Sequence, residues 1–157
     1  MTWNIDNVRR CRAYNSVNQA IGAGGWTQPL LNSSSYDPSG MNTGAAIAAK
    51  HDGVWHVGGV VLWLAPGGAV TIGMRLLVST VSSGVIILSE ETDEQAVGQS
   101  KSFNLSSDYQ CRAGDTFYMQ VFCSLAHTIS GSSFNANYGT ALWAHSVGTT
   151  FNEVNIL

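Results

Sequence analysis

One stretch decides the fold class of this chain: residues 70–79, which read VTIGMRLLVS. Apolar side chains occupy every second position from Val70 to Val78, and smaller or polar residues lie between most of them. A period of two is that of a β-strand with one buried face. Residues 103–105 and 117–123 alternate in the same way. These stretches predict half-buried strands, and no long stretch has the 3.6-residue period of an amphipathic helix.

Two further runs are continuously apolar rather than alternating, at Val54–Leu64 and Val85–Leu88. Such runs are typical of strands that are covered on both faces. Turn sequences separate the predicted strands, at Asp37–Gly40, Pro66–Gly68, Ser82–Gly84, Ala113–Asp115 and Ser130–Ser132. Short strands spaced by about eight to twelve residues indicate a sandwich or a barrel. The sequence therefore predicts an all-β protein: a short N-terminal arm, residues 1–10, and one sandwich domain, residues 11–157.

The chain is poor in charge. Charged residues make up 11% of its 157 residues and the net charge is −3, against about 25% charged residues in typical soluble domains. Hydrophobic residues make up 45%, which excludes intrinsic disorder, and the charge balance offers no basic footprint for nucleic acid. No charged residue occurs from Thr116 to Asn152. We interpret this as surface covered by other copies of the chain, the alternative being a neutral surface rich in Ser, Thr, Asn and Gly.

Membrane insertion is not expected. The longest apolar tract, Val54–Leu64, is interrupted by His56 and two glycines, and it is shorter than the ~20 residues that a membrane helix needs. The first residues contain no apolar core of a signal peptide, so we expect no cleaved signal. The three cysteines, Cys11, Cys111 and Cys123, are expected to be free buried thiols, with a Cys11–Cys111 disulfide as the alternative.

The order of several motifs resembles the C1q/tumour-necrosis-factor-like jelly-roll family. The motifs are spread over about residues 11 to 147: a first strand at Cys11–Ile21, then Trp26-Thr27, Tyr36-Asp37 ahead of Gly40-Met41, Gly53-Val54-Trp55, Ala113–Phe117, and an aromatic closing strand at Tyr138–Trp143. Trp55 stands where the family usually has Tyr. The resemblance implies a jelly roll of about ten antiparallel strands that assembles as a compact homotrimer. Folds of this kind serve as recognition heads, and many occur in bacteriophage structural proteins.

Catalytic and metal-binding patterns are weak. The sequence contains no G-x-S-x-G, H-E-x-x-H or P-loop motif, so we expect no enzymatic activity and no cofactor. The acidic run Glu90–Glu94 could bind Ca²⁺, but it lacks the ligand spacing of a calcium loop, and a solvated loop is the favoured interpretation. The histidines are scattered. A three-histidine metal site on a trimer axis is the alternative to structural roles for them.

Binding surfaces are better indicated. Trp3 lies in the arm beside Arg9, Arg10 and Arg12, and Trp with Arg dominates interface hot spots. We predict that these four residues dock on a partner, the alternative being that the arm folds back on its own subunit or a neighbour. Two segments rich in Ser, Asn and Tyr are predicted to be adaptable recognition loops. Their candidate residues are Asn32, Tyr36, Asn135 and Tyr138.

These features favour a non-enzymatic virion protein of a bacteriophage, a trimer that decorates or cements the capsid. Its partners are then copies of itself and other virion proteins, such as capsid or tail subunits, and it is assembled in the host cytoplasm. The alternative is a receptor-binding tip of a tail or head fibre that recognises a host-surface glycan or protein. A cellular C1q-like binding protein is a third hypothesis, and an enzyme is the least favoured.

Overall fold

The computed structural model describes residues 10–131 and 139–148, and within these ranges the chain forms eleven β-strands and no helix. None of the described residues therefore lies in a helix that could cross a membrane. The strands are β1 (Arg10–Tyr14), β2 (Gln19–Ile21), β3 (Ser33–Tyr36), β4 (Ile47–Ala48), β5 (Gly53–Trp63), β6 (Val70–Thr80), β7 (Gly84–Gln95), β8 (Lys101–Cys111), β9 (Thr116–Cys123), β10 (His127–Ile129) and β11 (Ala141–Gly148).

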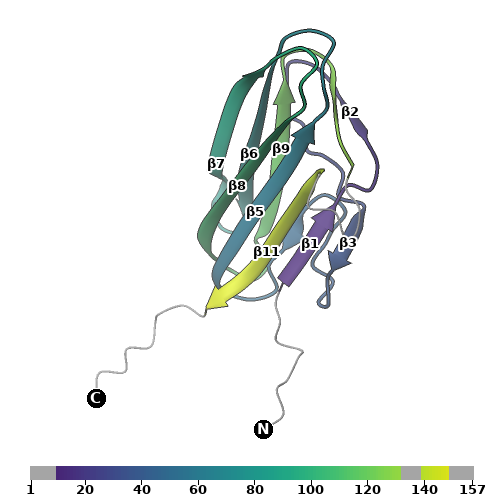
Figure 1. Cartoon of the computed structure of the whole chain (residues 1–157). Coiled ribbons are helices and arrows are strands. Elements are labelled where there is room, and N and C mark those ends of the chain that lie inside the picture. Colours follow the sequence, from purple (N-terminus) through teal and green to yellow (C-terminus); the bar gives the residue numbers. More distant parts are fainter. Residues whose placement is uncertain (1–9, 132–138, 149–157) are drawn as a thin grey trace, which may run out of the picture.

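The strands form two antiparallel sheets that pack face to face (Figure 1). The first sheet has the order β2-β10-β5-β11-β1-β3, and β8 pairs with β5 along its whole length. The second sheet has the order β4-β9-β6-β7, so β7 is an edge strand. β1 begins and β11 ends at the lower end of the sandwich in Figure 1, the end at which β7 begins.

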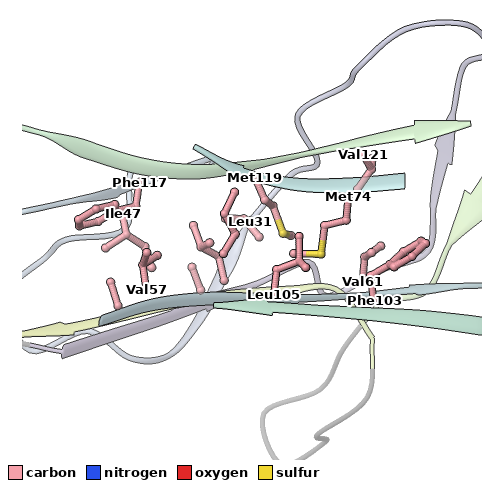
Figure 2. Packing of buried hydrophobic residues seen from close by; sticks show 14 of the residues in the cluster. Leu31, Ile47, Val57, Val61, Met74, Phe103, Leu105, Phe117, Met119 and Val121 are labelled. Atoms are coloured by element: carbon pink, nitrogen blue, oxygen red, sulfur yellow. The ribbon is translucent and has the colours of Figure 1, made fainter. Parts of the chain in front are cut away.

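Alternating side chains of both sheets fill the space between them (Figure 2). Met74, Phe117 and Met119 of the second sheet face Val57 and Leu105 of the first. Trp55 and Trp63 are fully buried. All three cysteines are free and buried, which confirms that interpretation and excludes the Cys11–Cys111 disulfide. Burial raises the pKa of Cys11 and of Cys111 to about 12 and also raises that of Cys123.

The alternating stretches form strands as predicted, in β6, β8 and β9, and the run Val54–Leu64 forms β5. The predicted first strand, Cys11–Ile21, is instead two strands, β1 and β2, which belong to different parts of the first sheet. The fully buried Asn15 breaks it: its side chain accepts a hydrogen bond from the Val17 N–H at 3.1 Å and donates one to Gln19 at 2.9 Å. Such a side-chain turn replaces the strand ladder.

Two predictions about β7 are wrong. Its segment Val85–Leu88 was expected to be covered on both faces, yet Val85 and Ile87 are 58% and 50% exposed, because β7 lies at the edge of a sheet. The run Glu90–Glu94 was expected to be a loop, but it continues the same strand. Pairing with β6 along residues 84–95 holds these acidic residues extended.

Candidate interaction surfaces

Three of the predicted site residues meet on the outer face of the first sheet. Arg10 and Arg12 belong to β1, and Tyr36 lies opposite Arg12 on β3. The Arg10 guanidinium carbon lies 4.7 Å from the centre of the Tyr36 ring, and that of Arg12 lies 5.7 Å from the Tyr14 ring. Arg12 also donates a hydrogen bond to the Ser35 hydroxyl at 2.7 Å. We call Arg10, Arg12, Tyr14 and Tyr36 the arginine–tyrosine face.

These positions correct two predictions. Arg10 is the first residue of β1 rather than the last residue of an arm, since it pairs with His145 of β11. Tyr36 lies in a strand rather than in a recognition loop, because Ser33–Tyr36 supplies the neighbour that β1 needs on its outer side. Asn32, just before β3, accepts a hydrogen bond from the Ser16 N–H at 2.9 Å and so ties two connections together.

The other four predicted site residues lie outside the described residues. They are Trp3, Arg9, Asn135 and Tyr138.

A polar row crosses the same face beside the arginines. In register across four strands lie Arg10 of β1, His145 of β11, His56 of β5 and Asp108 of β8. The His56 and His145 rings are 5.2 Å apart, and the His56 Nδ1 atom lies 2.6 Å from the Asp108 carboxylate. This row was not predicted, because the residues that form it come from four distant parts of the sequence.

Trp143 lies flat on this face in the row next to the histidines. Its indole ring covers Gly58 so closely that a Cβ atom on that glycine would lie 2.4 to 2.7 Å from three ring atoms. Gly58 therefore provides the space for Trp143. Trp143 is half-buried, and its strand lies between β1 with the arginine–tyrosine face and β5.

The edge strand β7 forms a second surface, on the side of the sandwich away from β1 (Figure 1). Its first half exposes 58% of Val85, 37% of Ile86 and 50% of Ile87. We call these three residues the apolar edge. Val85 and Ile87 lie opposite Ser79 and Leu77 of β6, on the outer side of the second sheet. Exposed apolar side chains on a long edge strand are typical of a site where another chain pairs.

The second half of β7 is acidic. Glu90 lies 3.7 Å from Arg75, and Glu94 accepts a hydrogen bond from the Thr71 hydroxyl at 2.8 Å. Asp93 forms an ion pair with Lys101. The hydrogen bond that the Lys101 ammonium donates to the Asp93 carboxylate lowers the pKa of Asp93. These carboxylates therefore have structural partners. Within the described part of the chain, no group of three acidic, His or Cys side chains could hold a metal ion, so the structure gives the calcium alternative no support.

The remaining histidines have structural surroundings. His51 packs against Trp55 with ring centres 4.9 Å apart, and His127 stacks on Trp63 at 5.4 Å. His51, His127 and the His56–His145 pair therefore lie at three separate places of the subunit and do not form one cluster.

A third surface is the end of the sandwich opposite the start of β1, at the top of Figure 1. The loops there, residues 15–18, 64–69, 96–100 and 124–126, contain no charged residue. Val17, Val97 and Leu125 of these loops are between 57% and 59% exposed. A shallow pocket of about 90 Å³ lies beside Leu125, lined also by Pro66, Gly67, Gly68, Val70, Ala126 and His127. We call this end the uncharged end.

Comparison with known proteins identifies the fold. No protein-family model matches the sequence, and no curated protein matches it. Solved structures do match. The tumour necrosis factor Eiger from S. frugiperda has a TM-score of 0.69 and 11% identity, with 96% of this chain and 99% of that chain covered. The globular domain of zebrafish complement 1qA has a TM-score of 0.66 and 12% identity, with 90% and 99% covered. Murine APRIL has a TM-score of 0.67 and 12% identity, with 90% and 100% covered.

The fold is a TNF/C1q-like jelly roll. At these identities the likeness shows the fold alone, and it confirms the jelly-roll fold that the resemblance of the motifs implies. Sequence reasoning missed the apolar edge, although the signal was present: an apolar run followed at once by an acidic one in GVIILSEETDE, residues 84–94.

Proposed function

We propose that this protein is a non-enzymatic structural protein of a bacteriophage virion, a homotrimer that decorates or cements the capsid. One observation carries the proposal: the sandwich exposes a group of three apolar side chains at each of two separate places, the apolar edge and the uncharged end. A protein that joins its own copies and also binds a shell needs two such surfaces.

Self-association is supported by the opposite charges of two further surfaces. The acidic half of β7 and the arginine–tyrosine face carry opposite charge and lie on different sides of the subunit. Two different surfaces that complement each other give a head-to-tail contact, which closes into a ring when the rotation fits. A ring of three agrees with TNF and C1q domains, which are typically homotrimers.

The trimer is tested by light scattering at micromolar concentration. We expect three times the 16.7 kDa mass of the chain. A monomer at these concentrations would refute the proposal, since an obligate assembly does not dissociate there.

The virion role is tested by immunogold labelling of intact particles and by one matched pair of variants. L125D places a charge on the uncharged end, and I87S removes an apolar side chain from the apolar edge. We expect L125D to remain trimeric and to be lost from particles, with I87S weakened as a trimer. Normal incorporation of L125D would show that the uncharged end does not bind the shell.

A receptor-binding fibre tip is the second candidate. The uncharged end favours it as well, because neutral loops that surround a shallow pocket suit a neutral ligand such as a host glycan. Gold label over the whole shell supports decoration, whereas label confined to the fibre ends supports host recognition.

A further inference from the structure

We infer that the N-terminal segment of one copy, residues 1–9, pairs with the apolar edge of the neighbouring copy as an added parallel strand. The inference rests on the proposed self-association and names the contact that supports it. β-strand addition is a common way to occupy an exposed sheet edge, with main-chain hydrogen bonds giving affinity and side chains giving specificity.

The edge is open to such a strand. Among the described residues, β7 pairs only with β6, and no described strand is hydrogen-bonded to its other side. Val85 and Ile87 point to the outer side of the sheet and are about half exposed or more. No charged residue occurs from Leu76 to Ser89. The edge also lacks the lysines and prolines that commonly protect edge strands.

The segment has a matching pattern. Met1, Trp3 and Ile5 alternate with Thr2 and Asn4, which is the period of a strand with one apolar side. Cross-strand pairs of aromatic and β-branched residues are among the more favourable ones in sheets. A strand that places Trp3 beside Val85 therefore also places Ile5 beside Ile87.

Charge decides the direction of the added strand. β7 has a bulge at Leu88, because Leu76 pairs with Ser89 and Leu77 with Ile87. Beyond this bulge, a parallel strand with Ile5 at Ile87 brings Arg9 opposite Thr92, diagonally between Glu90 and Glu94. An antiparallel strand would carry Arg9 past Val85 to the uncharged hairpin. The parallel direction brings Arg9 to the acidic half of β7, and it places Asp6 opposite the uncharged Ser89.

The same register excludes docking on the segment's own subunit. Arg9 is bonded to Arg10, and Arg10 is separated from β8 by β11 and β5. Three strand spacings place Arg10 about 14 Å from β8, and β7 belongs to the opposite sheet. The Cα atom of Arg9 lies only about 3.8 Å from that of Arg10. Arg9 can therefore not reach Glu90 and Glu94 of its own chain, which leaves a neighbouring copy for the inferred contact.

Disulfide trapping tests the contact directly. The double variant I5C/I87C is oxidised at pH 8, and I5C/V97C is the control, since Val97 is 59% exposed at the far end of β7. The native thiols do not interfere: they are buried, and the pKa of Cys11 and of Cys111 is about 12. We expect covalent oligomers from I5C/I87C, formed on the order of a hundredfold faster than from the control, because adjacent thiols have millimolar effective concentration.

Two further measurements fix the arrangement. Mixing the single variants I5C and I87C should give a covalent dimer, which only a contact between copies produces. The pair R9C/T92C should also cross-link, since these positions meet only in the parallel register. If light scattering shows an oligomer but I5C/I87C cross-links no faster than I5C/V97C, the inference is wrong and self-association stands. A monomer would overturn both the inference and the proposed trimer.

Discussion

Replacing Ile87 by Ser should weaken the assembly more than it weakens the subunit. Half of the Ile87 side chain is exposed in the isolated subunit. Burying a whole Ile side chain stabilises by about 2 kcal/mol, so burying the exposed half contributes about 1 kcal/mol at each contact. A closed trimer has three such contacts, and the loss of about 3 kcal/mol corresponds to roughly a hundredfold smaller association constant.

Sedimentation equilibrium over a range of concentrations measures this constant. V97S is the matched control, because Val97 has similar exposure but lies at the uncharged end. By the same arithmetic, the half of Ile87 that is buried in the subunit contributes about 1 kcal/mol, so the dissociated I87S subunit should lose no more than about 1 kcal/mol of its free energy of unfolding. An unchanged association constant for I87S, or an equal loss in V97S, would refute the assignment of the apolar edge to the subunit contact.

Three other substitutions or measurements test the fold that positions these surfaces. G58A should destabilise the protein by about 1–3 kcal/mol in urea unfolding, because the new methyl group meets the Trp143 ring below 3 Å. D115A should lower the free energy of unfolding by about 2 kcal/mol in the same urea measurement, since the buried Asp115 carboxylate accepts hydrogen bonds from two backbone N–H groups. Cys11 and Cys111, with their pKa raised to about 12, should not react with a thiol reagent at pH 8 until the chain unfolds, and their contribution to stability should fall as pH rises from about 9 towards 12.

Each of these predictions has a control that separates it from general damage. Gly67 has open space around its Cβ position and no positive φ, so G67A should leave stability nearly unchanged. D115N keeps one acceptor oxygen and should cost less than D115A. Fast reaction of Cys11 in the native state would show that the first sheet opens around β1. A stability that stayed constant from pH 9 to pH 12 would contradict the raised thiol pKa values.

Local patterns predicted the strands because each pattern depends only on neighbours in the sequence. The alternation in residues 70–78 and 117–123 gives β6 and β9 directly. The apolar run in β7 shows the limit of this reasoning. Continuous apolar residues indicate a strand, but they do not say whether a second strand or a facing sheet covers it. That depends on the sheet order, in which β7 is last.

Strand order also gives a different explanation for the absence of charged residues from Thr116 to Asn152. The uncharged stretch from Thr116 predicted a covered surface between copies. In the structure, much of it forms β9, which lies between β4 and β6, and β11, which lies between β1 and β5. Central strands lack charges for reasons internal to the subunit. The proposed contact between copies therefore rests on β7, which is not part of that stretch.

The candidate surfaces were harder to predict because they depend on register between distant strands. Arg10 and Tyr36 both appeared in the sequence as possible binding residues, but their contact requires the pairing of β1 with β3. Trp143 covers Gly58 only because β11 and β5 align at these two residues. A shift by one residue would move Trp143 to the core side. No local pattern encodes that register.

The two halves of β7 together explain how an exposed edge can serve assembly without causing aggregation. An apolar edge alone would pair with another β7 as readily as with a different strand. In a parallel β7–β7 pair the acidic halves would lie side by side, and like charges opposite each other destabilise a sheet. The bulge at Leu88 further restricts regular pairing to the short apolar half. The edge therefore disfavours parallel pairing with its own copy and favours a segment that brings apolar residues such as Trp3 and Ile5 to the apolar half and a cation such as Arg9 to the acidic half.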